Sequence, residues 1–577
     1  MQNFTLSKQF FRDVWYLTKS YWQSEEKKKA FFLLTCIVGL TLAIVYMLVL
    51  LNRWNNSFYS ALQNYQTDLI FDELIHFTYL AFIYIILAVY SYYLQQVLIL
   101  NWRRWLTERF IEIWLKNKTY YNLQMFGKDT DNPDQRISED VRLFVEMTLS
   151  FAIGLLKSLT TLASFVVILY ELSGSLKFTL FGQQWEISGY LFWAAFFYSI
   201  LGTWVTHLVG RKLVKLNFIQ QRYEADFRFA MIRLRESSES VAFYRGEAQE
   251  GRVFKERFTL LLDNFWKIIT KQKQLVWLNS GYSQIAIIFP FVAAMNRYLA
   301  KEFTLGGLMQ VASAFGRVQD SLSYFVDTYS SLATWQSVVM RLTYFGRHMQ
   351  EVSADAERFH LDRFVAAGEV RAENMQVDLP DGTPLLKDVT FTLEPGANVL
   401  IKGVSGSGKS TLLRAIAGIW PYVEGTIALP EQEKLMFIPQ KPYLPLGSLR
   451  EALLYPGNKP VSDEVLIALM EQCQIGYLQD KLDIVADWSH VLSVGEQQRL
   501  AFVRAHIQEP LWLFLDEATS ALDEETEAKM YTLVGERLPA TTIVSIGHRS
   551  TLNKYHQHIL QLDKGNKSVV LKLYRSF

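Results

Sequence analysis

The sequence predicts a chain with two parts: an all-α domain of six membrane-spanning helices, followed by an α/β domain of alternating strands and helices. Three observations support this fold class. Long uncharged runs fill the first 330 of the 577 residues, and ordinary soluble composition follows from about residue 350. From Gly368 onward, short β-branched runs alternate with helical stretches. A single hydrophobic core is not expected at this length, because such cores stop growing at roughly 250–300 residues.

The N-terminal part contains runs long enough to cross a bilayer, which takes ~20 apolar residues. We expect a transmembrane domain over residues 30–345, with spans at about 30–51, 76–100, 150–170, 188–210, 275–296 and 306–331. The sixth run is more polar than the others. An aromatic, charged stretch within residues 1–29 predicts an N-terminal interfacial helix. Residues 346–367 are expected to be a linker, and residues 368–577 to form the α/β domain.

The charges of the connecting segments predict the orientation in the membrane. Segments 101–147 and 211–274 carry 8 and 14 Lys or Arg residues, whereas segments 52–75, 171–187 and 297–305 carry 1, 1 and 2. The positive-inside rule therefore places both termini and the two long segments in the cytosol. These segments read as long helices with turns near Phe126–Pro133 and Glu236–Glu247, where a cytosolic domain is expected to dock.

Composition also argues against several classes of protein. The net charge is +1 and no Lys/Arg-rich arm is present, so nothing supports a nucleic-acid partner. The only two cysteines are Cys36 and Cys473, far apart in the chain. They support neither a disulfide framework nor a metal cluster.

The last predicted span carries polar residues at alternating three- and four-residue steps, which places them on one helical face. They are Gln310, Ser313, Arg317, Asp320, Tyr324, Asp327 and Ser331. Ionisable groups at membrane depth are costly and usually face protein or a water-filled cavity. Arg317, Asp320, Tyr324 and Asp327 are therefore candidates to line a pathway for a hydrophilic solute. The alternative is a structural Arg317–Asp320 pair buried between helices.

A phosphate-binding loop follows the predicted strand Ala397–Lys402 and precedes a helix. Its residues are Gly403, Val404, Ser405, Gly406, Ser407, Gly408, Lys409, Ser410 and Thr411. This strand–loop–helix context is the one that the P-loop pattern requires. Backbone amides curl around phosphates, Lys409 reaches the terminal phosphates, and Ser410 is placed to ligate Mg²⁺.

Two acidic residues end a second apolar strand, Leu511–Leu515. Asp516 is a candidate Mg²⁺ ligand, and Glu517 is a candidate to orient and polarise an attacking water. Taken alone, two acids after a strand more often form a solvated turn. Together with a P-loop, they predict nucleotide hydrolysis.

The stretch Leu492–Arg499 (LSVGEQQR) lies between these motifs and opens a helix. With it, the whole set resembles the ATP-binding cassette (ABC) family. The resemblance implies that Ser493, Gly495 and Glu496 belong to the family signature. It also implies that Gln440 senses Mg²⁺ and contacts the membrane domain. His548 takes the place of the switch histidine at the γ-phosphate, and Ser520–Asp523 that of the loop crossing a dimer interface.

Further implications of the resemblance are ATP and Mg²⁺ as cofactors and a second copy of the chain as partner, because the signature of one subunit caps ATP bound to the other. Two positions depart from the family pattern. Val494 stands where glycine is common, and its β-branched side chain narrows the permitted backbone geometry. Leu379 stands where an aromatic residue is expected to stack on adenine. The hydrolytic residues Lys409, Asp516, Glu517 and His548 are intact.

A closer resemblance covers nearly the whole chain. The segments LNRWNNSFYSALQ, WRRWLTERF, NPDQRISED, RESSESVAFYRGE and AGIWPYVEGTI look like the peroxisomal-type (subfamily D) transporters and their bacterial BacA/SbmA-like relatives with a fused ATPase. This family implies an exporter-type fold with domain-swapped inner loops. Its resemblance assigns coupling to the ATPase domain to Glu236, Glu239, Phe243 and Tyr244.

The resemblance leaves the cargo and the direction of transport open. Members of the family are linked to fatty acyl-CoA, to cobalamin, and to peptides and other hydrophilic molecules. The polar face through Arg317, Asp320 and Asp327 favours a hydrophilic solute. The bacterial BacA/SbmA-like relatives are linked to uptake, so the resemblance to them makes uptake across a bacterial inner membrane, with the ATPase domain in the cytosol, the expectation. The alternatives are a fatty acyl-CoA or lipid transporter, a non-transporting ATPase that acts on a partner, and passive or proton-driven carriage.

Overall fold

The structure is a computed structural model that describes residues 8–126, 132–180, 183–358, 361–365, 368–431, 434–457, 459–563, 565 and 567–573. The chain divides into two compact units. The first contains Met1–Glu112 and Asp131–Arg347, and the second contains Ile113–Thr130 and His348–Phe577. The segment Ile113–Thr130 thus groups with the C-terminal domain, although we expected it to be part of the transmembrane domain.

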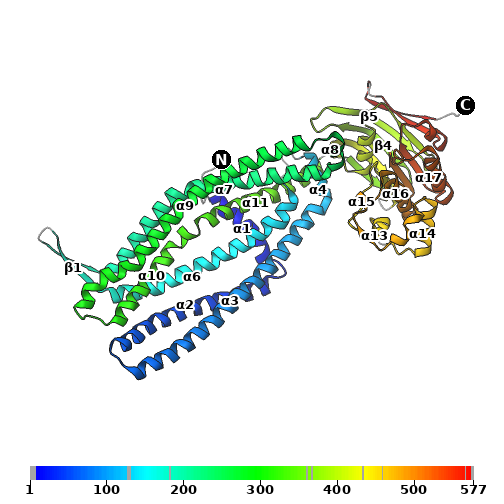
Figure 1. Ribbon diagram of the computed structural model, residues 1–577. Helices are drawn as coiled ribbons and strands as arrows, with labels where there is room; N and C mark the ends of the chain where they lie inside the picture. The colour runs from blue at the N-terminus through cyan, green and yellow to red at the C-terminus, as the bar shows by residue number, and fades with distance from the viewer. Residues whose placement is uncertain are drawn as a thin grey trace. The chain divides into compact units, whose positions relative to one another are not determined.

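Long helices make up the first unit (Figure 1). They are α1 (Lys8–Trp22), α2 (Lys27–Gln63), α3 (Thr67–Leu115), α6 (Val141–Ser173), α7 (Tyr190–Glu236), α9 (Glu247–Leu299), α10 (Leu305–Asp327) and α11 (Tyr329–Arg358). Short elements connect them: α5 (Pro133–Gln135), a π-helical turn at Arg136–Asp140, strands β1 (Ser175–Leu180) and β2 (Gln183–Ser188), and α8 (Ser238–Tyr244).

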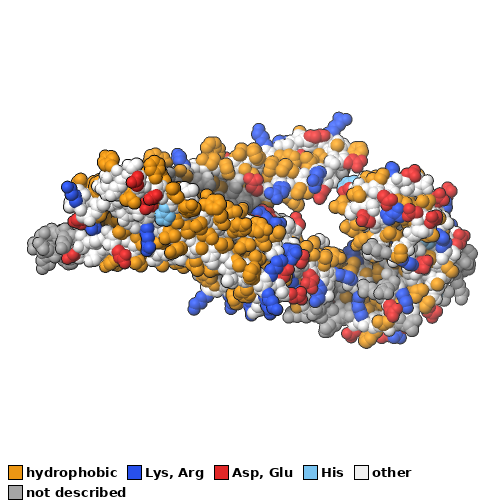
Figure 2. Space-filling model, turned by 90° about the horizontal axis from the view of Figure 1, so that it is seen from below, with side chains coloured by type: hydrophobic (Ala, Val, Ile, Leu, Met, Phe, Trp, Pro, Cys, Tyr) orange, Lys and Arg blue, Asp and Glu red, His pale blue; other side chains and the backbone are white. Residues whose placement is uncertain are grey.

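In the described residues, five helices are long and apolar enough to cross a membrane. They cover Lys27–Gln63, Thr67–Met125, Pro133–Ser173, Tyr190–Glu236 and Glu247–Met295. The surface of this unit carries broad areas of hydrophobic side chains (Figure 2). Helix α10 is not among the five, because it is too polar, yet it packs against α2, α6, α7 and α9. The sixth span therefore stays a prediction.

The core of the helical unit gathers around α10. Val311, Phe315 and Val318 of this helix are almost fully buried, together with Phe165 and Leu169 of α6. The apolar side of α10 faces its neighbours, and its charged residues Arg317, Asp320 and Asp327 lie on the exposed side.

One side of the N-terminal helix α1 packs against the other helices of this unit. The Phe10 ring meets the Trp335 ring of α11 edge-on, and the Tyr21 ring stacks on Trp102 of α3. Asp13 pairs with Arg347 of α11 at 2.5 Å. The opposite side of α1 exposes Phe11 and Trp15. A helix that packs on one side and exposes aromatic side chains on the other is typical of the membrane interface. The location of α1 at this interface stays a prediction.

The connections at the two ends of the helical unit differ. Turns or a hairpin join α2 to α3, α6 to α7 and α9 to α10. Between α6 and α7, where we expected a short loop at 171–187, the antiparallel strands β1 and β2 pair from Ser175–Ser188 onward. At the other end, α7 and α9 are joined by α8 at the predicted turn Glu236–Glu247. The other predicted turn, Phe126–Pro133, includes residues 127–131, which lie outside the described residues.

The second unit begins within the predicted linker. Helix α11 runs through to Arg358, and β3 (Leu361–Val365) already pairs with β7 (Val423–Leu429). The described residues of the predicted linker, 346–358 and 361–365, are thus a helix end and a strand. That strand belongs to the domain's second sheet, ordered β3-β7-β4-β5, with β4 (Val370–Asp378) and β5 (Pro384–Leu393).

A six-stranded sheet, ordered β14-β13-β6-β12-β11-β8, forms the centre of this unit. Its strands are β6 (Val399–Lys402), β8 (Leu435–Ile438), β11 (Trp512–Asp516), β12 (Thr542–Ile546), β13 (His558–Asp563) and β14 (Ser568–Leu573). All neighbours are parallel except β13 and β14. Nearly uninterrupted apolar strands such as β11 and β12 are expected in a parallel sheet covered on both sides.

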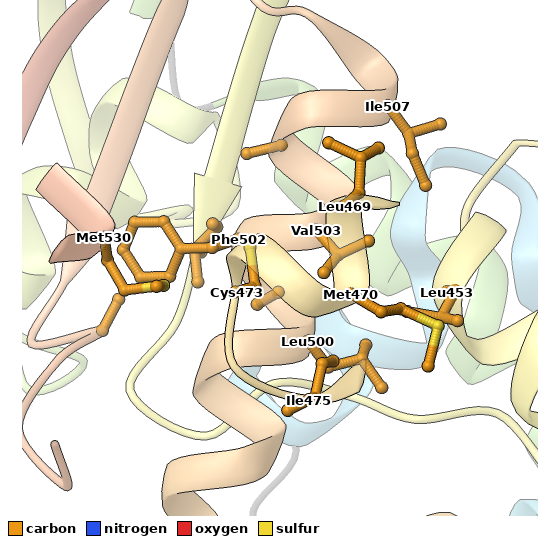
Figure 3. Close-up of a cluster of buried hydrophobic side chains, with 14 of the residues drawn as sticks. Leu453, Leu469, Met470, Cys473, Ile475, Leu500, Phe502, Val503, Ile507 and Met530 are labelled. Carbon is orange, nitrogen blue, oxygen red and sulfur yellow. The ribbon is translucent and has the colours of Figure 1, made fainter. Parts of the chain in front are cut away.

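Helices complete the unit: α4 (Thr119–Phe126), α12 (Lys409–Ala417), α13 (Leu449–Leu454), α14 (Asp463–Gln472), α15 (Trp488–Val491), α16 (Val494–Gln508) and α17 (Glu524–Arg537). The remaining short elements are Lys116–Lys118, β9 (Gly447–Ser448), Gly476–Lys481, β10 (Val485–Ala486) and Ser550–Tyr555. Helix α16 is buried among these elements, with Leu500, Phe502 and Val503 packed against Met470 and Met530 (Figure 3).

Candidate functional site

Four of the predicted site motifs follow four parallel strands of the six-stranded sheet. The P-loop follows β6, Gln440 follows β8, Asp516 and Glu517 end β11, and His548 follows β12. Carboxyl ends of parallel strands lie at the same edge of a sheet, where ligands of open α/β sheets bind. The register β8-β11-β12-β6 therefore brings residues from four distant stretches to one edge.

The P-loop is shaped by glycines whose backbone a side chain would disturb. Gly406 and Gly408 have φ values of +72° and +94°, in the region that favours glycine. A Cβ on Gly403 would lie 2.6 Å from the Ser407 Oγ. The Lys409 Nζ donates to the carbonyl oxygens of Gly403 and Val404 at 2.9 and 3.2 Å. This cradle of backbone amides at the start of α12 fits a phosphate group.

The predicted Mg²⁺ ligands Ser410 and Asp516 meet directly. The Ser410 Oγ donates to the Asp516 Oδ1 at 2.9 Å. Burial raises the pKa of Asp516, and the hydrogen bond from Ser410 opposes this rise. A hydroxyl and a carboxylate beside a phosphate cradle are the oxygen donors that Mg²⁺ prefers, so these two residues fit the ion.

Glu517 is held between two other predicted residues. Its Oε2 accepts from the Gln440 Nε2 at 3.1 Å, and its Oε1 lies 3.4 Å from the His548 Nε2. Its backbone is in the left-handed region, with φ +50°. Such a conformation costs a residue other than glycine ~1–3 kcal/mol and persists only where the surroundings impose it. The carboxylate is thereby fixed beside Asp516 and the P-loop.

The signature residues form the start of α16. The Ser493 Oγ accepts from the Glu496 backbone N–H at 3.3 Å, and the Glu496 carboxylate accepts from the Ser493 N–H at 2.7 Å. These reciprocal bonds are a capping box. Val494 is the first residue of the helix with its side chain exposed, so the departure from glycine is accommodated as ordinary helical backbone. Gly495 lies close to the Ala521 carbonyl oxygen.

Two residues that we did not single out tie these parts together. The Gln498 amide donates to the Gln440 carbonyl oxygen at 2.9 Å and accepts from the Ala521 N–H at 3.1 Å. Arg549 donates to the carbonyl oxygens of Leu522 and Ser520 at 2.7 and 3.2 Å. Both stand beside motif residues in LSVGEQQR and SIGHR, and that adjacency was the only available signal.

The base side of the site contains the second departure from the family pattern. Leu379 is half-buried, and its N–H donates to the Thr383 carbonyl oxygen in the turn after β4. The Trp420 indole donates to the Asp378 carbonyl oxygen at 2.9 Å, beside this turn. The Trp420 side chain is thus hydrogen-bonded to the backbone next to Leu379.

The predicted pathway residues separate into two groups. Arg317, Asp320 and Asp327 are exposed along α10. The Tyr324 hydroxyl instead donates to the Phe151 carbonyl oxygen of α6 at 3.3 Å, over Gly154. Among the described salt bridges, none joins Arg317 to Asp320, and both side chains are exposed. The pathway lining and the structural pair both stay predictions. Gln310 is buried against α2.

The two inner segments differ in exposure. Glu236 ends α7, and α8 carries Glu239, Phe243 and Tyr244, all of them exposed. Phe243 and Tyr244 are 79% and 87% exposed, which is unusual for large aromatic side chains. The first inner segment instead packs on the α/β domain, with Leu123 buried and Met125 against its apolar core.

Comparisons with known proteins agree with this site. The family description "ABC transporter transmembrane region 2" matches residues 17–299, and "ABC transporter" matches residues 386–520. An ABC transporter ATP-binding protein of Haemophilus influenzae is 36% identical over 97% of this chain and 94% of its own length. The inner membrane ABC transporter ATP-binding protein YddA of Escherichia coli is 32% identical over 92% of this chain and 94% of its own.

Proteins with lower sequence identity also match this chain over nearly its whole length. The lysosomal cobalamin transporter of Homo sapiens is 28% identical over 95% of this chain and 94% of its own length. A solved bacterial Atm1-family ABC exporter with ATP bound has a TM-score of 0.71 at 17% identity, over 95% of both chains, which shows the exporter fold. The chain is therefore a member of the ABC transporter family, a half-transporter of the subfamily D type with one helical membrane region fused to one ATPase domain.

Proposed function

We propose that this chain works as a homodimer that hydrolyses ATP with Mg²⁺ at two composite sites and thereby takes up a hydrophilic solute across a bacterial inner membrane. The observation that supports it most is the arrangement around Glu517. Lys409, Asp516 and His548 stand at the same sheet edge, while a separate helical unit exposes a charged side of α10.

Within one site, the roles follow from the contacts. Lys409 neutralises charge on the terminal phosphates, and Ser410 and Asp516 hold Mg²⁺, which when bound supplies further charge neutralisation. Glu517 is the residue that orients and polarises the attacking water. Gln440 and His548 hold its carboxylate from two sides.

The two-chain site is supported by the position of the signature. Among the described hydrogen bonds, the Ser493 side chain bonds only to Glu496 of its own helix and not to the P-loop. Its exposed capping group is thus available to the nucleotide of a second copy. The exposed aromatic pair Phe243 and Tyr244 on α8 is a suitable docking group for the partner's ATPase domain.

A hydrophilic cargo is supported by Arg317, Asp320 and Asp327, which are exposed along the central helix α10 of an otherwise apolar bundle. The human relative named as a cobalamin transporter supports the same class of cargo. Uptake and the bacterial inner membrane rest on this class of cargo and on the relative from Escherichia coli.

A substrate screen in proteoliposomes tests the proposal. We expect cobalamin or a cationic peptide to stimulate ATP hydrolysis and to accumulate, in an ATP-dependent manner, on the side of the membrane that carries the ATPase domain. Stimulation by acyl-CoA alone would instead identify a lipid-type transporter. Hydrolysis without flux of any candidate would indicate an ATPase that acts on a partner.

The pathway assignment is tested by Asp320→Ala and Asp327→Ala. We expect both to reduce cargo-stimulated hydrolysis more than basal hydrolysis, because they remove charges from the pathway but not from the ATP site. Asp263→Ala, which removes an exposed acid from α9, is the matched control. Equal loss of basal and stimulated rates in the α10 variants would favour a structural role.

A further inference from the structure

The helix of the first inner segment is sharply interrupted at residues that are not glycine. Helix α3 ends at Leu115, and Asn117 and Lys118 then have φ values of +51° and +55° before α4 begins at Thr119. This conformation costs residues other than glycine roughly 1–2 kcal/mol each. Two adjacent residues in it mark a position that the surrounding contacts impose.

The break places Lys118 at the far end of the P-loop helix. The Lys118 Nζ lies 3.4 Å from the carbonyl oxygen of Gly418, the residue that caps the C-terminus of α12. Carbonyl groups at a helix C-terminus lack intrahelical partners and carry partial negative charge. The ammonium therefore meets the end of the helix whose other end, at Lys409, cradles phosphate.

A second cation joins Lys118 at the same turn. The Arg363 guanidinium, from β3, donates to the Ala415 carbonyl oxygen at 3.4 Å. A Cβ on Gly418 would lie 1.7 Å from this guanidinium, so glycine is required for the approach. Burial, and then the nearby Arg363 charge, lower the pKa of Lys118. Two cations thus hold the last turn of α12.

The other end of the segment is fixed to the same stretch of the ATPase domain. The Tyr422 hydroxyl donates to the Met125 carbonyl oxygen at 3.2 Å, and Met125 packs against the domain core. Gly418–Tyr422, which we call the seat, is the GIWPY part of the motif after the P-loop. Its Trp420 donates to the backbone beside Leu379. The seat therefore touches the inner segment, the P-loop helix and the turn after β4.

The helix whose last turn these two cations hold, α12, is nine residues long. Its first residue is Lys409 of the P-loop.

We propose that Lys118 is a positioning residue of the ATP site. By holding the C-terminal turn of α12 in the seat, it determines the position and orientation of the P-loop at the other end of that helix. A helix of this length spans ~14 Å and moves as a rigid rod. The first inner segment of a chain thereby tunes the nucleotide affinity of that same chain, a role distinct from that of the exposed α8.

ATP hydrolysis by the full-length dimer in lipid nanodiscs, measured against ATP concentration, tests this assignment. Lys118→Met keeps the length of the side chain and removes its charge. We expect it to raise the KM for ATP by about two- to fivefold, the range that a charge at a helix end supports. The kcat should change much less, because Lys118 touches neither Glu517 nor Asp516. Lys118→Arg should restore the wild-type KM.

Lys116→Met is the matched control, since it removes the same charge from an exposed lysine two residues earlier. An equal rise in KM for Lys116→Met, or an unchanged KM for Lys118→Met, would overturn the proposal. If Lys118→Met does not fold, Tyr422→Phe is the second variant, because it removes only the hydroxyl that bonds to Met125. An unchanged KM for ATP in Tyr422→Phe would contradict the role of the seat in positioning the P-loop. The readout is ATP alone, so it is independent of the cargo and of the direction of transport.

Discussion

At the scale of single residues, Glu517 is the side chain whose position is most tightly determined. Gln440 and His548 contact its two carboxylate oxygens, and the Glu517 N–H donates to the Ile546 carbonyl oxygen at 3.1 Å. Replacing the carboxylate by an amide preserves this shape and removes the charge that, in the proposed mechanism, polarises the attacking water. Its neighbours on the P-loop are not disturbed.

Glu517→Gln should therefore bind ATP like the wild type and hydrolyse it ~10²–10⁴ times more slowly, the usual contribution of such a group. Single-turnover hydrolysis and nucleotide binding by equilibrium dialysis would measure the two effects separately. Glu525→Gln, an exposed acid in α17, is the control and should keep the wild-type rate. An unchanged rate in Glu517→Gln would remove its assigned role.

His506 is a buried residue whose ring nitrogens make no hydrogen bond among the described residues. It lies in α16, is 6% exposed, and burial lowers its pKa to about 4. Because the pKa in the folded state lies below the ordinary value of 6.5, neutral His506 favours the fold above pH 6.5. That stability is lost as the pH falls through about 4.

His506→Leu should consequently be neutral or stabilising at pH 7, since it removes unpaired polar groups from the core. Its advantage in thermal midpoint over the wild type should grow as the pH is lowered from 7 to 5. In His506→Leu, the pH dependence of the thermal midpoint should be weaker than in the wild type but still present, because burial also lowers the pKa of His556 to about 4. The surface variant His490→Leu is the control, and an advantage independent of pH would contradict this account.

At the scale of elements, a polar ladder joins α2 to the start of α10. Asn52 and Asn56 donate to the Gln310 backbone and side-chain oxygens at 3.1 and 2.9 Å. The hydroxyls of Ser60 and Thr304 lie 2.7 Å apart. These residues of α2 all belong to LNRWNNSFYSALQ, so this motif is the α2 side of a helix–helix contact. Gly306 lets the two backbones approach closely.

Gly306→Ala should destabilise the helical unit, because the added Cβ would lie 2.0 Å from the Asn56 carbonyl oxygen. We expect a loss of about 1–3 kcal/mol, as for other overpacked contacts, seen as a lower thermal midpoint in detergent. Gly316→Ala on the same helix meets nothing within 4 Å and is the control. A wild-type midpoint for Gly306→Ala would mean that the helices separate easily.

At the scale of the whole molecule, the proposed dimer makes each ATP site from two chains. Lys409 of one copy and Ser493 of the other would share one nucleotide. A dimer of two different single variants then behaves differently from a dimer that carries both substitutions in one chain. This difference tests the composite site directly.

Co-expression of Lys409→Ala with Ser493→Arg should restore about half of the wild-type hydrolysis, because the mixed dimer contains one site with both residues intact. The double variant Lys409→Ala/Ser493→Arg paired with wild type leaves no intact site and should be inactive in the mixed dimer. Differently tagged chains and tandem purification would isolate these dimers. Equal activity in both pairings would show that each chain hydrolyses ATP alone.

The ATP site was largely predictable from the sequence because its chemistry is local. The P-loop, Asp516–Glu517 and His548 each follow a short apolar strand, and parallel strands necessarily present their carboxyl ends together. The capping box at Ser493 is also a local pattern of residues three positions apart. The roles of Gln498 and Arg549 were missed, since most of their partners are backbone groups, which carry no residue type, and all of these partners lie at least 22 positions away in the chain.

What the sequence by itself determined is the presence of an ABC ATPase domain and the division into an apolar helical part and an α/β part, because both depend on residues adjacent in the chain. Tertiary structure alone decided that Ile113–Thr130 packs with the ATPase domain, that α11 and β3 occupy the expected linker, and that Tyr324 faces α6. The contact of Lys118 with Gly418 joins residues 300 positions apart. Residue periodicity reports on neighbours along the chain and does not predict contacts over such a sequence separation. These contacts arise only when helices pack against sheets.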